Sequence, residues 1–322
     1  MGMDALSQEA IASYKNRFRS LHPEHVFLSK GEMEFLEFLG AARKGGDEAY
    51  HPTIAGLLMF GYSHKIVYEF PEYFLDYQEH YSEDANVRWT DRVTSDSGDW
   101  SGCLYDFYGK IVNKLTSDLK VPFRMEGIER IDESNLHKAL REGLCNALSN
   151  ADFHQRMGLV IKKYADRIEF HNPGCLRLPA ERAFQGGDSD ARNKAILKMW
   201  SLVGVGERAG SGLPMILSAC QECGFGKPDL YDEYNPDRTH LIIHLRPEEK
   251  PLPPSKVGTD VDERQRKVLG YLSSNGQSKA KDIASSIGFG LSTVKAILYR
   301  LVASGLVEAK GSIKNRTYGL AK

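Results

Sequence analysis

Three short motifs follow one another in the middle of the chain, and their order constrains the fold more than any other feature. They are Glu142-x-x-x-Asn146, Asn172-Pro173-Gly174 and Gly210-Ser211-Gly212. The first motif places a carboxylate and an amide one helical turn apart, so both can face one ligand. The second ends a strand, and the third opens a helix whose free backbone N–H groups suit phosphate oxygens. Together the motifs predict a nucleotide site.

The segment between the first two motifs predicts a β-hairpin. Residues 158–164 alternate between apolar and polar side chains, 165–167 form a turn, and the alternation resumes from Ile168. The second strand of this hairpin leads directly into Asn172. A last strand is expected at 239–245, after the helix that follows the third motif.

This order of elements is similar to that of the Bergerat or GHKL ATP-binding fold of gyrase, heat-shock-90, histidine-kinase and mismatch-repair proteins. More narrowly, residues 141–153, 166–176 and 205–216 resemble the divergent GHKL domain of prokaryotic transcriptional regulators that carry an Alba/Schlafen-like domain upstream. Members of that family are often labelled as helicase-related. The resemblance implies ATP and Mg²⁺ as ligands.

The resemblance also implies roles for the helical residues. Glu142 is expected to be the catalytic base, and Asn146 to ligate Mg²⁺ through its side-chain oxygen. Asn150 is expected to contact the nucleotide. Taken on its own, Glu142 would more often be a solvated helix carboxylate paired with Arg141 or Lys138. Asn146 favours the site, because an amide among apolar neighbours needs a partner if it is buried.

Further nucleotide contacts are implied at the second and third motifs. Asn172 takes the place of the usual aspartate, and its amide oxygen can still accept a hydrogen bond from adenine. Gly174 would let the backbone run beneath the base, whereas Leu176 replaces the second glycine of the family pattern. The phosphate-binding lid and a hydroxyl near the base are assigned to Gly210, Ser211, Gly212 and Thr239. An ordinary turn and strand capping remain the alternatives.

One catalytic motif is missing. The sequence contains no G-x-x-x-x-G-K-[ST], so a P-loop helicase motor is unsupported. The γ-phosphate has no assignable lysine. Nucleotide binding is therefore better supported than hydrolysis, and a weak Mg²⁺-dependent ATPase stays an open alternative.

Length and composition allow two or three domains, and the order of elements together with the resemblance implies an α+β fold. With 322 residues, 41% of them apolar, the chain can bury more than one core. We expect an N-terminal α/β region at 1–120, the end of an Alba/Schlafen-like domain and a connector. A GHKL-like α/β sandwich at 121–247, a proline-rich linker at 248–260 and a winged helix-turn-helix at 261–322 follow.

The winged helix-turn-helix is predicted from three helical patterns followed by an alternating ribbon. From residue 250 onward, 13 Lys and Arg stand against 5 Asp and Glu, which favours contact with nucleic acid. The third helix is expected to enter the major groove of double-stranded DNA while the wing contacts phosphates. The candidate DNA-binding residues are Ser292, Thr293, Lys295, Arg300, Lys310, Lys314 and Arg316. A protein-interaction or dimerisation module is the alternative.

The remaining features point to a cytoplasmic protein. The five cysteines have no disulfide-framework spacing, and no segment is apolar enough for a signal peptide or a membrane span. The leading hypothesis is a homodimeric DNA-binding transcriptional regulator whose nucleotide state modulates dimerisation or DNA binding. The alternatives are a degenerate GHKL scaffold that only dimerises and a slow ATPase in nucleic-acid repair or defence.

Overall fold

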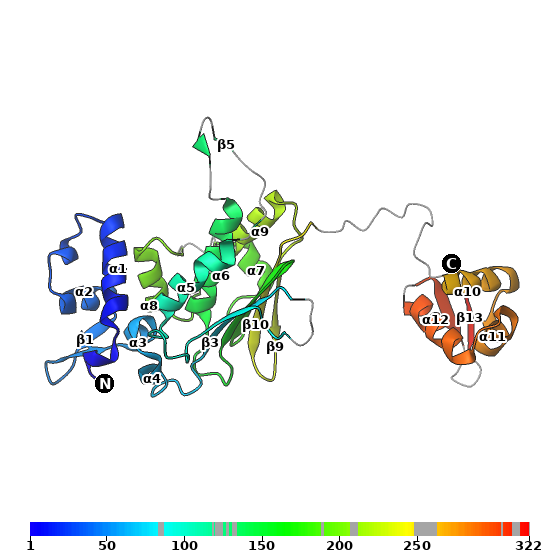
Figure 1. Cartoon of the computed structure of the whole chain (residues 1–322), viewed down its shortest axis with the longest axis horizontal. Coiled ribbons are helices and arrows are strands. Elements are labelled where there is room, and N and C mark those ends of the chain that lie inside the picture. Colours follow the sequence, from blue (N-terminus) through cyan, green and yellow to red (C-terminus); the bar gives the residue numbers. More distant parts are fainter. Residues whose placement is uncertain are drawn as a thin grey trace. The chain divides into compact units, whose positions relative to one another are not determined.

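The computed structural model describes most of the chain. It leaves out residues 83–86, 118, 120–124, 127–128, 131–133, 188–189, 207–211, 248–262, 304, 311–315 and 322. The predicted linker at 248–260 therefore lies outside the described residues. The chain divides into two compact units, Met1–Glu248 and Glu249–Lys322, and each is described by itself (Figure 1).

The alternating segments of the first unit form one mixed sheet, which has six strands in the described part of the chain. Its strand order is β4-β3-β7-β8-β10-β9. The strands are β3 (Leu75–His80), β4 (Asp91–Thr94), β7 (Leu159–Tyr164), β8 (Arg167–Pro173), β9 (Asp229–Glu233) and β10 (Arg238–His244). β3 and β7 are parallel, and the other neighbours are antiparallel. The predicted hairpin is confirmed as β7 and β8, and the predicted last strand is β10.

Period-two alternation separates the two faces of this sheet. Ile168 and Phe170 of β8 and Leu241 and Ile243 of β10 are buried on the inner face. Figure 1 shows α5, α6 and α8 grouped on one side of the sheet. The inner face therefore packs against helices, and this packing positions the residues discussed below.

The helices of the first unit begin and end as follows. They are α1 (Gln8–Leu21), α2 (Glu32–Leu39), α3 (Ile54–Phe60), α4 (Ser63–Ile66), α5 (Leu104–Thr116), α6 (Asn135–Asn150), α7 (Ala180–Gln185), α8 (Lys194–Leu202) and α9 (Gly212–Glu222). Two 3₁₀ turns, Met3–Ala5 and Val26–Leu28, and two small ribbons, β1 (Ala42–Lys44) with β2 (Tyr50–Pro52) and β5 (Met125–Glu126) with β6 (Glu129–Arg130), complete the elements.

Helix α6 forms because its sequence supplies both a cap and an apolar stripe. The Ser134 hydroxyl accepts a hydrogen bond from the His137 backbone N–H at 3.4 Å, which satisfies a free donor of the first turn. Leucines at every fourth position, 136, 140, 144 and 148, are buried. The packing of this stripe therefore fixes the direction in which Glu142 and Asn146, in the middle and second half of α6, can point.

The N-terminal region shares its core with the rest of the first unit. Buried apolar residues from Ala5 to Ile243 form one cluster, and the Tyr14 hydroxyl donates to the carbonyl of Met199 at 2.7 Å. Strands β3 and β4 belong to the same sheet as β7 to β10. The expected division at residues 120/121 stays a prediction.

The second unit has the order of a winged helix-turn-helix. It contains α10 (Glu263–Asn275), β11 (Ser278–Lys279), α11 (Ala280–Ile287), α12 (Leu291–Ala303), β12 (Val307–Lys310) and β13 (Thr317–Leu320). The ribbon β12–β13 was predicted, and β11 adds a short third strand to it. Gly288 follows the last residue of α11 and caps it, with a φ of +72°, the left-handed conformation that favours glycine. None of the helices in the described ranges is long and apolar enough to cross a membrane.

Candidate functional site: a cavity between α6 and the sheet

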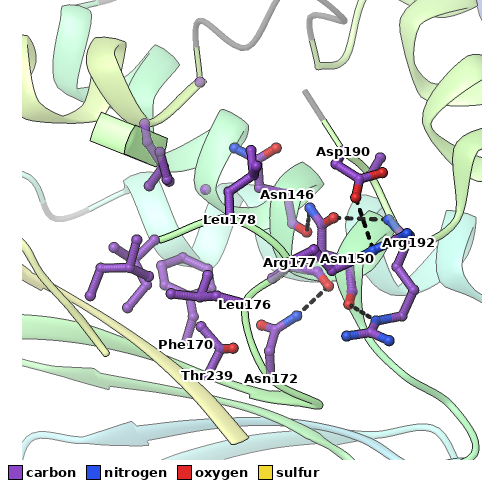
Figure 2. A pocket seen from close by; sticks show the side chains of 18 of the residues that line it. Asn146, Asn150, Phe170, Asn172, Leu176, Arg177, Leu178, Asp190, Arg192 and Thr239 are labelled. Atoms are coloured by element: carbon purple, nitrogen blue, oxygen red, sulfur yellow. Dashed lines mark hydrogen bonds and ion pairs between the residues drawn. The ribbon is translucent and has the colours of Figure 1, made fainter. Parts of the chain in front are cut away.

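A cavity of about 170 Å³ lies between α6 and the sheet, where the end of β8 is paired with the start of β10 (Figure 2). Its wall includes most of the residues predicted for the nucleotide site: Glu142, Asn146, Asn150, Asn172, Gly212 and Thr239. The fold thus brings the helical motif, the strand end and the start of α9 to one place. Gly210 and Ser211 lie outside the described residues.

The helical motif faces the first residue of α9. A Cβ atom added to Gly212 would lie 2.5 Å from Asn146 Nδ2 and 2.5 Å from Glu142 Oε1. Glu142 is only 5% exposed. A side chain at position 212 would therefore require Asn146 and Glu142 to move away from the start of α9. The amide and the carboxylate also lie at the positive end of α9, which favours negative charge there.

These two side chains fit the metal that the resemblance implies. A carboxamide oxygen and a carboxylate are hard oxygen donors, and Mg²⁺ takes one or two such ligands from protein and the rest from water and phosphate. Among the described residues, no group of three or more His, Cys, Asp or Glu side chains could hold a metal ion.

Asn172, at the strand end, has a fixed orientation. It is 8% exposed, and its Nδ2 donates a 2.6 Å hydrogen bond to the backbone carbonyl of Ala147 in α6. The amide oxygen is consequently the atom left to accept a hydrogen bond in the cavity. An aspartate could not make the same bond to Ala147 unless it were protonated.

Thr239 joins β10 to the loop after β8. Its hydroxyl lies 2.9 Å from the Gly174 carbonyl and 2.8 Å from Asp232 Oδ1. The Asp232 carboxylate also accepts from the Leu176 backbone N–H at 3.0 Å. Asp232, on β9, was missed from the sequence, since nothing local marks an acidic strand residue as a support for a distant loop.

Gly174 is not among the residues that line the cavity. Its φ is +89°, and a Cβ there would lie 2.8 Å from the Cβ of Asp152. This glycine therefore allows a close approach of the loop to the end of α6. The neighbouring Cys175 does line the cavity, and its partial burial raises the pKa of its thiol, with Asp232 adding to the effect.

Two arginines line the cavity and were also missed. Arg192 Nε donates to the Asn150 carbonyl at 3.2 Å, and its Nη2 donates to the Cys175 carbonyl at 2.9 Å. Arg177 pairs with Asp190 at 3.1 Å. The segment between the second and third motifs has no periodicity that would mark these residues in advance.

In the second unit, the candidate DNA-binding residues that the structure describes are mostly exposed. Lys295 and Arg300 are exposed on α12, Thr293 is half-buried, and Arg316 is exposed ahead of β13. Lys310 pairs with Glu308 at 2.7 Å. Lys314 and the side chain of Ser292 lie outside the described part of the chain. Tyr299 is also exposed on α12, at 78%.

Three segments of the chain match known families. Residues 1–76 match a domain of unknown function. Residues 158–241 match the family described as "Putative ATP-dependent DNA helicase recG C-terminal", and residues 261–308 match one described as "Winged helix-turn-helix DNA-binding". No curated protein matches the sequence significantly.

Solved structures add a likeness of fold. The DIP2311 protein from Corynebacterium diphtheriae is similar over 100% of this chain and 69% of that chain, with a TM-score of 0.54 and 14% identity. The Zα domain of PKZ from Carassius auratus, solved in complex with Z-DNA, is 38% identical over 17% of this chain and 89% of that chain, with a TM-score of 0.17. In agreement with the resemblance in its motifs, the chain joins an ATPase-like segment of the recG C-terminal family to a C-terminal winged helix-turn-helix.

Proposed function

We propose that this chain is a DNA-binding regulator whose cavity binds ATP with Mg²⁺ and whose nucleotide state alters DNA binding by the winged helix. One observation carries the proposal: Glu142, Asn146, Asn172, Gly212 and Thr239, which come from four separate elements, line a single cavity. The ATPase-like match at 158–241 and the winged-helix match at 261–308 support it.

The proposed binding mode follows from the orientation of each group. Asn172 turns its amide oxygen to the cavity because its nitrogen is held by Ala147, so it suits the exocyclic amino group of adenine. Asn146 and the start of α9 at Gly212 lie where a phosphate chain would end. Mg²⁺, when bound, would neutralise phosphate charge and be held by the Asn146 oxygen.

Calorimetric titration of the full chain with ATP and Mg²⁺ tests this mode. The variant Asn146→Ala should lose at least 10-fold in affinity, because a charge-assisted contact contributes about 1.5–3 kcal/mol. Asn16→Ala is the matched control, since Asn16 is exposed on α1 and does not line the cavity. Equal affinities of wild type and Asn146→Ala would contradict the site.

Regulation would act through dimerisation. A homodimer presents two winged helices related by a two-fold axis, which suits a palindromic operator of double-stranded DNA. Light scattering with and without ATP should show a rise in mass toward twice that of the monomer. Under the same conditions the DNA affinity should change, and Asn146→Ala should abolish both responses.

A second function, an unliganded scaffold that only dimerises, is favoured by the volume of the cavity. About 170 Å³ is below the roughly 300 Å³ at which small-molecule pockets usually begin. On this view neither ATP nor adenosine gives heat in the titration. A slow ATPase with Glu142 as base is separated from a pure sensor by phosphate release that vanishes in Glu142→Gln, measured with and without duplex DNA.

A further inference from the structure

The cavity holds few cations for a ligand as negative as ATP. Among the described residues of its wall, the basic side chains are Arg177 and Arg192, and the acidic ones are Glu142 and Asp190. A polyphosphate needs positive charge or N–H donors in excess of the carboxylates nearby. Within the described wall, an arginine that can change its partner would supply such charge beside the N–H donors at the start of α9.

The guanidinium of Arg192 is already engaged in hydrogen bonds to backbone carbonyls. Its Nε and Nη2 donate to the carbonyls of Asn150 and Cys175, at 3.2 Å and 2.9 Å, and its Nη1 lies 3.5 Å from Asp152. These contacts join the end of α6 to the loop after β8. Turning Arg192 toward a ligand would leave backbone carbonyls without donors, so it acts as a clamp.

Arg177 is held far more weakly. Its contact with Asp190 Oδ2 at 3.1 Å joins two half-exposed side chains, 43% and 36% accessible. Such surface ion pairs contribute about 0–1 kcal/mol, because water screens both charges. A second cation, Lys194, lies 3.9 Å from the other oxygen of Asp190 and can keep that carboxylate neutralised. Arg177 can therefore exchange its partner at little cost.

The position of Arg177 matches the phosphate side of the cavity. In the view of Figure 2, Arg177, Asp190 and Asn150 lie on the same upper side as Asn146, whereas Asn172 and Thr239 lie at the lower end. If adenine binds at the lower end, the phosphates extend toward Arg177. The planar guanidinium suits two phosphate oxygens at once.

We infer that Arg177 binds the phosphate chain of the nucleotide, and that Arg177 pairs with Asp190 when the nucleotide is absent. This inference rests on the proposed function. Arg177 would be the phosphate-binding cation that could not be assigned from the sequence. Asp190 and the nucleotide would then compete for the same guanidinium group. Affinity for ATP then depends on Arg177, whereas affinity for adenosine does not.

Calorimetry of the full chain with Mg²⁺-ATP and with adenosine tests the inference. Arg177→Met keeps an unbranched apolar stem and removes the guanidinium charge, so ATP should bind about 10–100-fold more weakly while adenosine binding changes less than about twofold. Asp190→Asn should strengthen ATP binding up to about fivefold. In the double variant this gain should disappear.

Two controls keep the result interpretable. Arg182→Met removes the same charge from α7, outside the cavity wall, and should bind ATP like wild type. Thermal unfolding of each variant shows that the fold is retained. Equal ATP affinity in Arg177→Met and wild type, or an equal loss for adenosine, overturns the inference. A wild type that binds neither ligand instead overturns the proposed function.

Discussion

Replacing Asn172 with aspartate provides a strict test of the site geometry. The Asn172 amide nitrogen donates to the Ala147 carbonyl at 2.6 Å in a place that is 8% exposed. In Asn172→Asp, an ionised carboxylate oxygen would face that carbonyl oxygen with no hydrogen between them. The protein can avoid this repulsion only by protonating the new side chain, which raises its folded-state pKa.

The magnitude follows from the cost of that proton. An aspartate with an ordinary pKa near 3.9 must take up a proton at pH 7, and each pH unit costs about 1.36 kcal/mol, so full protonation costs about 4 kcal/mol. Relaxation and water entry reduce this, and we expect a loss of about 2–4 kcal/mol at pH 7. Because the folded state then binds more protons than the unfolded state, the loss grows as pH rises above about 4.

Urea unfolding followed by tryptophan fluorescence is the appropriate assay. All three tryptophans, at 89, 100 and 200, belong to the first unit, so the winged helix does not contribute to the signal. Wild type, Asn172→Asp and Asn172→Ala should be compared at pH 5 and pH 8. The aspartate variant should approach wild type at pH 5, whereas the alanine variant should differ from wild type equally at both. A pH-independent difference for aspartate would refute the reasoning.

Three further predictions concern other parts of the molecule. Gly212→Ala should lower the free energy of unfolding by about 1–3 kcal/mol and abolish the heat of ATP binding, because the new Cβ meets two polar atoms at 2.5 Å. As a control, Gly109→Ala lies in open space on α5 and should raise the free energy of unfolding by about 0.5–1 kcal/mol. Lys295→Ala and Arg300→Ala should each weaken DNA binding in gel-shift titrations and lower the salt slope by about 1. Tyr108→Phe should leave the free energy of unfolding in urea unchanged or raise it by up to about 1–3 kcal/mol. The reason is that the buried hydroxyl has no hydrogen-bond partner within the described residues.

Much of the local structure could be predicted from the sequence. The helical spacing of Glu142 and Asn146 indicated α6, the alternating segments indicated β7 and β8, and a last strand was expected at β10. The three helices and the ribbon of the second unit were equally clear. Each of these signals lies within a window of fewer than about 20 residues, where backbone periodicity alone decides which side chains share a face.

The supports of the cavity could not be predicted in this way. Asp232 steadies the loop at Leu176 from another strand, and Arg192 clamps α6 from a segment without periodicity. The orientation of the Asn172 amide depends on Ala147, which is 25 residues away. Polar contacts of this kind leave no local pattern, because either partner alone looks like an ordinary surface residue.

The sequence by itself determined which residue types this protein offers a ligand and on which helix and strands they lie. Only the tertiary structure decided that they meet, because the meeting depends on pairings across long separations such as Leu75 of β3 with Leu159 of β7. Periodicity is a property of neighbouring residues, whereas the wall of a cavity is built by the packing of whole elements. For the same reason, a role for Arg177 emerged only once Asp190 and Arg192 had been located around it.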